Sequence, residues 1–485
     1  MDNDHKSLSK KLDLLNEVPC GDSFPTCKFI RDAHVAQKEL PSLKMDIINP
    51  NAAGIDIGSR SHFVAINQEH SDVKEFGVYA QDIKELLKWL LENDVKTVAM
   101  ESTGSYWQNL YTELQNSSIE VILTNGKFTK NIKGKKTDVL DCMWIQRLHT
   151  LGLLSGSFLP DLETEHLRTL VRHRGNLIQA TSKASKRMAQ NMRLMNLRLD
   201  IVVKDIVGLT GLRIINKICN GETSGKELAK LRHGNCKKSE EEIAKALQSN
   251  NRQDYLFVLK QELQKYQDTQ KLIIECDIEI KNILNQFVNQ DEVKKSLYID
   301  KKVHKRINKN TPKNIDLNLI SYQYFNGVDL YAIEGFSHGT VLTLMSEIGE
   351  KGILKFQNAQ HFTSWLRLAP NNKISGGHIL SSRTPKGSNR LKIALRQAAN
   401  SIGNLKDTHL SNFFNRIAYR KGRAVAVSAT ARKIATILWN MLYKNQQYNP
   451  PTVYEYLDQK RKRKVIELQK QIANLDARMS KIQPA

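Results

Sequence analysis

Four acidic residues in the N-terminal third of the chain have the types and spacing of a metal-binding carboxylate site. Asp56 lies inside one short apolar segment, and Glu101 directly follows another. Asp138 and Asp141 stand three residues apart, so both face one side of a predicted helix. Carboxylates that meet at strand ends and on a facing helix can hold divalent cations, which orient a phosphate and stabilise charge on its attacking and leaving oxygens. The pattern predicts phosphoryl transfer at a two-ion Mg²⁺ site that could also accept Mn²⁺.

Each acid taken alone has an ordinary explanation. A single Asp or Glu on a strand or helix is usually a surface or capping group, and Asp141 could lie on the solvent face of its helix. The combination is more informative, because aspartate is depleted from apolar strands unless it has a function there. Together the four acids are therefore candidate catalytic residues and metal ligands, although spacing alone does not rank Asp138 against Asp141.

A second candidate for catalysis is Ser375, which precedes two glycines in the segment NKISGGH at residues 372–378. Glycines let a backbone approach a phosphate closely, and nearby cations would stabilise a serine alkoxide and a pentavalent phosphorus. The segment predicts a flexible, glycine-flanked loop that presents a serine nucleophile. By itself, Ser-Gly-Gly more often marks a simple turn.

Basic residues surround this serine. Residues 370–433 contain thirteen Lys and Arg but one acid, Asp407. A solvated surface normally intersperses the two signs, so the excess predicts contact with phosphates. The residues expected to bind nucleic acid are Lys135, Lys136, Lys373, Arg383, Lys386, Arg390 and Arg396. A helix predicted at residues 390–402 would point its N-terminal turn towards the serine loop.

The whole chain carries the same sign of charge. Its 485 residues have a formal net charge of +23 and a pI near 9.6, which indicates a polyanionic partner, most commonly nucleic acid. The mean hydropathy of −0.46 is typical of a water-soluble protein. No run of roughly 18 apolar residues occurs, and residues 1–50 lack the apolar core of a signal peptide. We expect a cytoplasmic bacterial protein, associated with the nucleoid when it acts and with no membrane partner.

The segments around the four acids predict an α/β domain at residues 51–155. Strands are expected at residues 53–57, 62–67, 74–79, 97–100 and 120–123, and helices at residues 81–92, 106–114 and from residue 137 onward. This order, three strands followed by helix, strand, helix, strand and helix, matches the ribonuclease-H-like fold.

The rest of the chain predicts further regions. These are a polar extension at 1–50, a helical or coiled-coil domain at 156–290, a basic linker or insertion at 291–330, a mostly helical domain with the serine at 331–446, and a charged helix at 447–485. The helical domain contains a basic stretch at 182–199 and an amphipathic stretch at 261–287, separated by a loop or small helical insertion at 208–251. Two long helices suggest an antiparallel arm or coiled coil, which could mediate self-association.

The N-terminal domain resembles the RuvC-like domain of DEDD insertion-sequence transposases, the one-ten and eleven-eleven groups, which are related to pilin-gene invertases. The residues that carry the resemblance, over roughly 52–155, are the motifs GIDIGSRSHFVAI, MESTGSYWQNLY and GKKTDVLDCMWIQRL. The resemblance implies that the family's four DEDD acids fall on Asp56, Glu101, Asp138 and Asp141. GIDIG alone would be unspecific, but the three motifs together are specific.

The C-terminal domain resembles the second domain of the same family through YAIEGFSHGTVLTLMSEIG, FQNAQHFTSWLRLAPNNKISGG and KGSNRLKIALRQAA. The resemblance implies a transposase whose catalytic serine, matching Ser375, forms a covalent phosphoserine link to DNA. It also implies donor and target DNA as partners, a structured noncoding guide (bridge) RNA, and an acidic site that works beside the serine of another protomer. We therefore expect a homo-oligomer, at least a dimer and a tetramer in synapsis.

One segment departs from the family pattern. The family's Pro-Gly-x-Gly turn is here Glu334-Gly-Phe-Ser337, and the missing second glycine argues against phosphate binding by that backbone. Residues 156–330 are also longer than the resemblance leads one to expect.

Three other functions compete with a transposase. A RuvC-like nuclease such as a junction resolvase would use the acids without covalent serine chemistry. An actin-like ATPase would also begin with GIDIG, but its second phosphate loop and glycine-rich adenosine motif are not evident. A basic architectural protein would have no need of the four acids.

Overall fold

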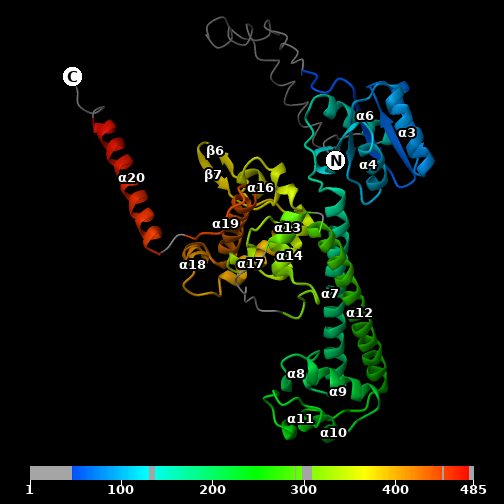
Figure 1. Cartoon of the computed structure of the whole chain (residues 1–485), viewed down its shortest axis with the longest axis vertical. Coiled ribbons are helices and arrows are strands. Elements are labelled where there is room, and N and C mark those ends of the chain that lie inside the picture. The colour runs from blue at the N-terminus through cyan, green and yellow to red at the C-terminus, as the bar shows by residue number, and fades with distance from the viewer. Residues whose placement is uncertain (1–45, 130–136, 290, 298–307, 451–452, 480–485) are drawn as a thin grey trace, which may run out of the picture. The chain divides into compact units, whose positions relative to one another are not determined.

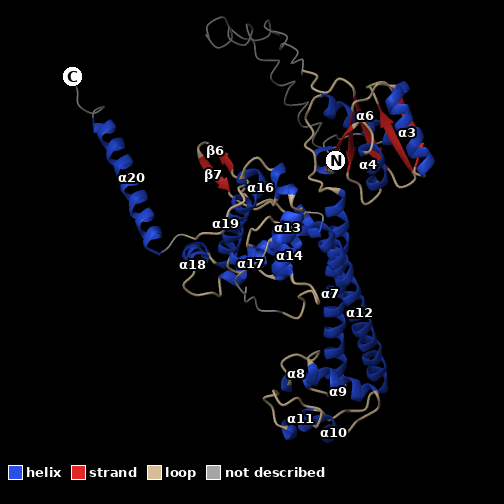
Figure 2. Ribbon diagram, viewed as in Figure 1, coloured by secondary structure: helices blue, strands red, loops and turns tan. Residues whose placement is uncertain are grey.

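The computed structural model describes residues 46–129, 137–289, 291–297, 308–450 and 453–479 of the chain. It divides into two compact units, Met1–Phe158 and Leu159–Ala485 (Figure 1). The first contains a mixed sheet covered by helices, and the second is mostly helical (Figure 2). The predicted α/β region followed by a helical part is therefore confirmed. None of the helices in the described part of the chain combines the length and hydropathy that a bilayer span requires.

The N-terminal unit is built on a five-stranded sheet in the order β3-β2-β1-β4-β5. Its strands are β1 (Ala52–Ile57), β2 (Ser61–Ala65), β3 (Val73–Gly77), β4 (Thr97–Glu101) and β5 (Glu120–Thr124). The first three form an antiparallel meander, while β4 pairs parallel with β1 and β5 parallel with β4. The carboxyl ends of β1 and β4 therefore meet at one edge, where Asp56 and Glu101 lie.

The helices of this unit are η1 (His70–Asp72), α3 (Ala80–Glu92), α4 (Trp107–Gln115), α5 (Gly126–Thr129) and α6 (Asp138–Thr150). Of these, α3, α4 and α6 pack on the sheet by burying apolar side chains. Ile83, Leu86 and Leu90 repeat at helical spacing and are buried on α3. The α6 helix lies against β1, where a Cβ at Gly54 would stand 2.2 Å from the backbone nitrogen of Gln146. Glycine at that position therefore allows the helix backbone to contact the strand.

Two long helices form an antiparallel arm in the second unit, as the sequence predicts. They are α7 (Leu162–Leu194) and α12 (Gln253–Asn289). Arg174 forms an ion pair with Asp277, and Arg187 Nη1 lies 3.2 Å from Glu262 Oε1, a pairing that requires opposite directions. The arm extends further towards the N-terminus than the predicted basic stretch, because Asp161 caps α7 by accepting a hydrogen bond from the backbone of Thr164.

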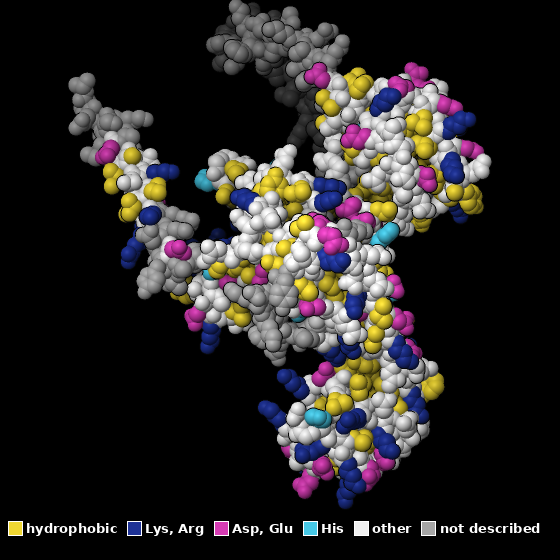
Figure 3. All heavy atoms as spheres, in the orientation of Figure 1, with side chains coloured by type: hydrophobic (Ala, Val, Ile, Leu, Met, Phe, Trp, Pro, Cys, Tyr) yellow, Lys and Arg dark blue, Asp and Glu magenta, His cyan; other side chains and the backbone are white. Residues whose placement is uncertain are grey.

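A small helical cap closes the far end of the arm. It consists of α8 (Leu199–Val202), α9 (Leu209–Cys219), α10 (Gly225–Ala229) and α11 (Glu240–Ala246). Its core joins Met188 and Met192 of α7 to Ile214, Leu228 and Ile243 of the cap. The segment 208–251 is therefore a small helical insertion. In Figure 3, Lys and Arg (dark blue) and acidic side chains (magenta) are interspersed over this end, as on an ordinary solvated surface.

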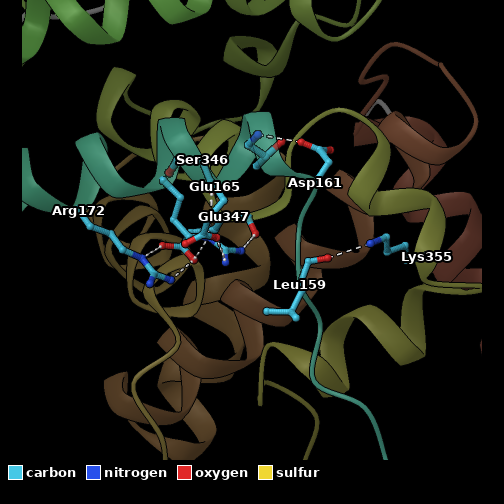
Figure 4. A network of polar contacts seen from close by, with 9 residues as sticks. Leu159, Asp161, Glu165, Arg172, Ser346, Glu347 and Lys355 are labelled. Carbon is cyan, nitrogen blue, oxygen red and sulfur yellow. Dashed lines mark hydrogen bonds and ion pairs between the residues drawn. The ribbon is translucent and has the colours of Figure 1, made fainter. Parts of the chain in front are cut away.

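Ion pairs fix the base of α7 on α15 (His338–Ile348), as Figure 4 shows. Arg172 donates two hydrogen bonds to the Glu347 carboxylate, with nitrogen–oxygen distances of 2.9 and 2.7 Å. Arg168 donates to the Glu165 carboxylate and to the backbone carbonyl oxygens of Ser346 and Glu347. Buried charges are tolerated only when they are fully bonded in this way, so the network holds the arm at a defined angle to α15.

The remaining helices of the second unit gather around one apolar core. They are α13 (Glu292–Ser296), α14 (Leu317–Tyr324), η2 (Leu330–Ala332), α15, η3 (Lys351–Lys355), α16 (Ala359–Trp365), α17 (Arg390–Ile402), α18 (His409–Lys421) and α19 (Arg423–Tyr443). Buried Leu344, Phe362, Leu395, Phe414 and Leu438 lie within them. The chain ends in α20 (Val453–Met479).

The described part of the predicted linker, 291–330, differs from that expectation. It folds into α13 and α14, and Leu317, Ile320 and Tyr324 of α14 are buried. These three apolar residues are spaced as on one face of a helix, but they stand in a segment rich in polar and basic residues. The composition of the segment therefore does not reveal the helix. Residues 308–330 therefore belong to the folded body.

Candidate active site and nucleic-acid interface

Asp56 lies near the end of β1, on the face of the strand that contacts α6. Gly54 and Asp56 are two positions apart, so both face the same side of the sheet. The helix runs opposite to the strand: the Asn49 side chain donates to the His149 carbonyl, and the Gln146 side chain donates to the Ala52 carbonyl. Continuing this register brings Asp56 to the first turn of α6.

That first turn carries Asp138 and Asp141, as the sequence predicts. Thr137 caps the helix by accepting a hydrogen bond from the backbone of Leu140 at 3.3 Å. Because α6 begins at this cap, the two aspartates lie at its N-terminal end, where the helix dipole favours negative charge. The cap and the register together explain why residues 82 and 85 positions beyond Asp56 approach it.

The electrostatics of Asp56 place all four acids in one neighbourhood. Burial, followed by the charges of Asp141, Asp138 and Glu101, raises the pKa of Asp56 to about 6, although a backbone hydrogen bond from Ile57 opposes the shift. Among the described residues Asp56 has no ion-pair partner to offset this repulsion. A carboxylate held near three others without a cation is electrostatically strained, and a divalent cation would relieve that strain.

Glu101 is directed towards the end of β5 rather than to the other acids. The Thr129 hydroxyl donates a hydrogen bond to Glu101 Oε2 at 2.6 Å, and a Cβ at Gly126 would stand 2.2 Å from Glu101 Oε1. Within the described ranges no three His, Cys, Asp or Glu side chains lie close enough together to hold a metal ion. Like charges repel, so the Thr129 hydroxyl is a more favourable partner for the Glu101 carboxylate than another carboxylate would be.

The donor set nevertheless fits a hard divalent cation. All four side chains offer carboxylate oxygens, the ligands that Mg²⁺ and Mn²⁺ prefer. Three of them flank the half-buried Asp56 closely enough to raise its pKa. Rotation of Glu101 away from Thr129 is the change that ligation would need.

Ser375 lies in a β-hairpin rather than in the flexible loop that the sequence predicts. Strands β6 (Lys373–Ser375) and β7 (His378–Ser381) pair antiparallel, with Ser375 opposite His378. The turn uses Gly376 and Gly377, whose φ angles of +54° and +77° suit a two-residue hairpin turn. Ser375 is exposed, and no heavy atom would contact a Cβ at either glycine, so the serine is accessible to a phosphate.

The predicted nucleic-acid-binding residues near the hairpin divide into two groups. Lys373, Arg383, Lys386 and Arg390 are exposed. Arg396 is partly buried and donates a hydrogen bond to the Ser428 hydroxyl, so it also has a structural role. Lys135 and Lys136 lie outside the described residues.

The N-terminal turn of α17 is partly occupied by its own cap. The Asn389 side chain accepts a hydrogen bond from the backbone of Lys392 at 2.9 Å. The Lys392 side chain is buried and donates to the Pro385 carbonyl, and burial lowers its pKa. The exposed Arg390 side chain is therefore better placed to contact a phosphate than the backbone of this helix is.

Sequence reasoning missed one exposed aromatic residue in the basic region. Tyr419 on α18 is 95% exposed, and its neighbours Arg416, Arg420 and Lys421 are basic. An exposed ring among cations is a suitable stacking surface for a nucleic-acid base. The segment FFNRIAYRKGR could have indicated this residue, because its tyrosine stands among arginines and a lysine.

Comparison with known families separates two matching segments. Residues 53–196 match the family model DEDD_Tnp_IS110, described as a transposase, and residues 329–415 match the model described as the transposase IS116/IS110/IS902 family. Both matched segments are therefore similar to transposase domains of the IS110 family. The comparison with curated proteins found no match.

The two transposase domains contain the candidate residues. The first match spans all four acids and continues through α7, beyond the extent of the predicted resemblance. The second spans Ser375 and the five described cations of the prediction. The matches support DNA transposition and recombination, with DNA as substrate, and a DEDD domain suggests dependence on a divalent metal.

Proposed function

We propose that this transposase cuts and joins DNA with two sets of groups, the carboxylates of Asp56, Glu101, Asp138 and Asp141 and the hydroxyl of Ser375. The observation that carries the proposal is the placement of the acids at the carboxyl ends of β1 and β4 and on the first turn of α6, within the segment that matches a DEDD transposase model; burial, followed by the charges of the other three acids, raises the pKa of Asp56. The strand order β3-β2-β1-β4-β5, with its antiparallel meander and two parallel strands, supports a ribonuclease-H-like (RuvC-like) fold for that domain.

The four acids are proposed as ligands of Mg²⁺. When bound, the cation would neutralise charge on the phosphate and on the leaving oxygen. Asp56 is central, since it is half-buried and the charges of the other three acids act on it. Asp138 and Asp141 lie in the helix turn that Thr137 caps, and Glu101, which accepts a hydrogen bond from Thr129 in this structure, would have to give up that bond to bind the cation.

Ser375 is proposed as the nucleophile. Its Oγ forms a bond to phosphorus, one phosphorus–oxygen bond of the DNA backbone breaks, and the departing DNA hydroxyl gains a proton as the serine hydroxyl loses one. The exposed position beside two glycines supports this role, because a phosphate can approach without a clash. Nearby exposed cations, among them Lys373, Arg383 and Lys386, would stabilise the charge that develops on phosphorus.

A guide RNA and a homo-oligomer complete the proposed assembly. The net charge of +23 supports binding to nucleic acid, and the guide RNA itself is proposed from the motifs that resemble the family. Exposed Lys183 and Lys186 on α7 add cations away from the serine domain. Kinship with pilin-gene invertases and the pairing of acids and serine from different protomers remain predictions from the same motifs.

Trapping the covalent intermediate tests the serine. DNA that flanks the gene, with the RNA transcribed from it, is incubated with wild-type protein and denatured. We expect a protein–DNA adduct whose phosphopeptide maps to Ser375 by mass spectrometry. The adduct should disappear in Ser375→Ala and persist in Ser382→Ala, a matched exposed serine seven residues away.

The same experiment separates the recombinase from its nearest alternative. A RuvC-like nuclease or junction resolvase would cleave DNA in the Ser375→Ala variant and would form no adduct in the wild type. Cleavage without adduct, at wild-type rate in Ser375→Ala, would therefore reject the covalent mechanism while leaving the carboxylate site in place.

A further inference from the structure

The C-terminal helix α20 leaves its side chains in solvent. It spans 27 residues, and all its described side chains, Glu455, Arg461, Lys462 and residues 464–476, are exposed. In Figure 3, hydrophobic side chains (yellow) lie along this helix among Lys and Arg (dark blue). A helix gains stability mainly by burying an apolar face, so this face calls for a partner.

Four of the five large exposed apolar residues described on α20 follow a heptad repeat. They are Val465, Leu468, Ile472 and Leu475, with exposed fractions of 52%, 45%, 57% and 58%, while Ile466, 53% exposed, lies beside the repeat. The intervals of three, four and three residues alternate as a and d positions do in a coiled coil. Glu467, Lys470 and Asn474 stand on the outer positions of the same turns, so the apolar seam is bordered by polar residues and widened only at Ile466.

The residue types on this seam indicate what covers it. Val465 and Ile472 are β-branched and occupy the a positions, while Leu468 and Leu475 occupy the d positions. This arrangement favours two parallel strands, in which each a residue meets an a residue and each d meets a d. The seam is therefore complementary to a copy of itself. A membrane-bound helix would need a wider apolar face.

We propose that α20 pairs in parallel with α20 of a second copy of this chain, through Val465, Leu468, Ile472 and Leu475. The pairing does not depend on the carboxylate or serine chemistry. It identifies one surface through which copies of the chain associate.

The basic run at residues 460–464 sets the ionic-strength dependence of this pairing. These five consecutive Lys and Arg directly precede the seam. Parallel pairing brings two such runs together, which is unfavourable at low salt and is relieved by counterions or by nucleic-acid phosphates. Pairing should therefore strengthen as salt is added, opposite to a contact held by ion pairs.

The seam is short, so the full chain is the right material for a test. Two heptads fall below the roughly three to four that a self-sufficient coiled coil needs. Other contacts between copies would raise the local concentration of α20 and allow it to pair.

Disulfide trapping in the full-length protein tests both partner and direction. In Leu468→Cys, parallel pairing places the two substituted side chains within disulfide range, so mild oxidation should yield a covalent dimer. Mass spectrometry should show a bond between position 468 of both chains. In Lys470→Cys, on the outer face, the dimer should form at least tenfold more slowly; wild-type protein controls for the native cysteines.

A second substitution in the Leu468→Cys background tests the seam. Leu475→Asp should reduce the initial cross-linking rate at least tenfold, whereas the charge-matched Asn474→Asp should change it less than twofold. Raising the salt should increase the rate. Because the described side chains of α20 are exposed, these changes leave the folded body intact.

Three results would overturn the proposal. If Lys470→Cys cross-linked as fast as Leu468→Cys, the disulfides would arise from random collision. If Leu475→Asp and Asn474→Asp reduced the cross-linking rate equally, the apolar seam would not contribute to pairing. A rate that falls with added salt would assign the contact to charge rather than to the apolar residues.

Discussion

In the N-terminal unit, Asp56 lies on a strand of a five-stranded sheet and faces a helix whose backbone touches that strand. In the C-terminal unit, Ser375 ends one strand of a two-stranded hairpin and is exposed. An isolated hairpin has little stability of its own, whereas the sheet and α6 are fixed by a buried core. The fold therefore positions the acids, whereas the exposed serine side chain is accessible to a phosphate.

The comparison predicts that both sites are essential but that neither is needed for binding. Asp56→Asn, Glu101→Gln and Asp138→Asn should each reduce strand exchange by ~10³-fold or more, since each removes a charge from the proposed cation site. Nucleic-acid affinity at matched salt should remain within about twofold. Quantitative gel analysis of recombination and fluorescence anisotropy measure the two quantities.

The control for these variants is Glu120→Gln, which should retain full activity. Glu120 is an exposed acid at the first residue of β5. Complete loss of binding in the single variants would contradict a catalytic role for the acids.

Glycine substitutions should separate the two regions by stability. Gly54→Ala places a methyl group 2.2 Å from Gln146 N and 2.5 Å from the Cys142 carbonyl, so α6 must move. We expect a loss of about 3 kcal/mol in the N-terminal unit, measured as faster amide exchange in β1 and α6. Gly376→Ala meets open space and costs ~1 kcal/mol of backbone strain at its φ of +54°, confined to the hairpin. Equal losses of stability in Gly54→Ala and Gly376→Ala would contradict the expected difference between the two regions.

Acid should destabilise the N-terminal unit through His149. Its ring is buried, and its Nε2 shares a hydrogen bond with the Thr97 hydroxyl. Burial lowers the pKa of His149 from 6.5 to about 4. Between those values the unfolded chain binds a proton that the folded chain does not, so stability falls as pH drops from 6.5 towards 4. The expected loss is ~2 kcal/mol, seen as a pH-dependent unfolding midpoint in urea.

Asp56 opposes this trend, because its raised pKa lets the folded state hold a proton below about pH 6. The acid loss should therefore be larger in Asp56→Asn and smaller in His149→Gln. A pH profile that is unchanged in both variants would contradict the assignment.

The smallest effects are expected at single cations of the C-terminal domain. Lys386→Ala or Arg390→Ala should weaken DNA binding by about threefold and reduce the slope of log affinity against log salt by about one. Arg396→Ala should instead lower stability, because Arg396 donates to Ser428. Salt titrations of binding distinguish them, and an unchanged slope in Lys386→Ala would remove it from the interface.

The acids were predictable from sequence because their spacing follows from regular structure. A short apolar strand, a strand end and an i,i+3 pair each predict a direction for the side chain, and Thr137 marks the helix start. The orientation of Glu101 was not predictable, since the Thr129 hydroxyl that holds it lies 28 residues away.

The serine region was less predictable. Two glycines between short polar and apolar alternations also predict a hairpin, and the expected loop gave too little weight to that pattern. The buried helix α14 was hidden because its apolar residues stand among polar ones, and tertiary packing decides such segments.

The central claim is that the four carboxylates of Asp56, Glu101, Asp138 and Asp141 bind a divalent cation. Thermal unfolding of the N-terminal unit, in wild type and Asp56→Asn, with chelator and with saturating Mg²⁺, tests it without relying on activity. With chelator, Asp56→Asn should be more stable than wild type by ~1 kcal/mol, since repulsion among the acids is reduced. Mg²⁺ at about a hundred times its dissociation constant should stabilise wild type by ~2.7 kcal/mol and leave Asp56→Asn nearly unchanged. Equal stabilisation of both proteins, or of neither, would contradict the account.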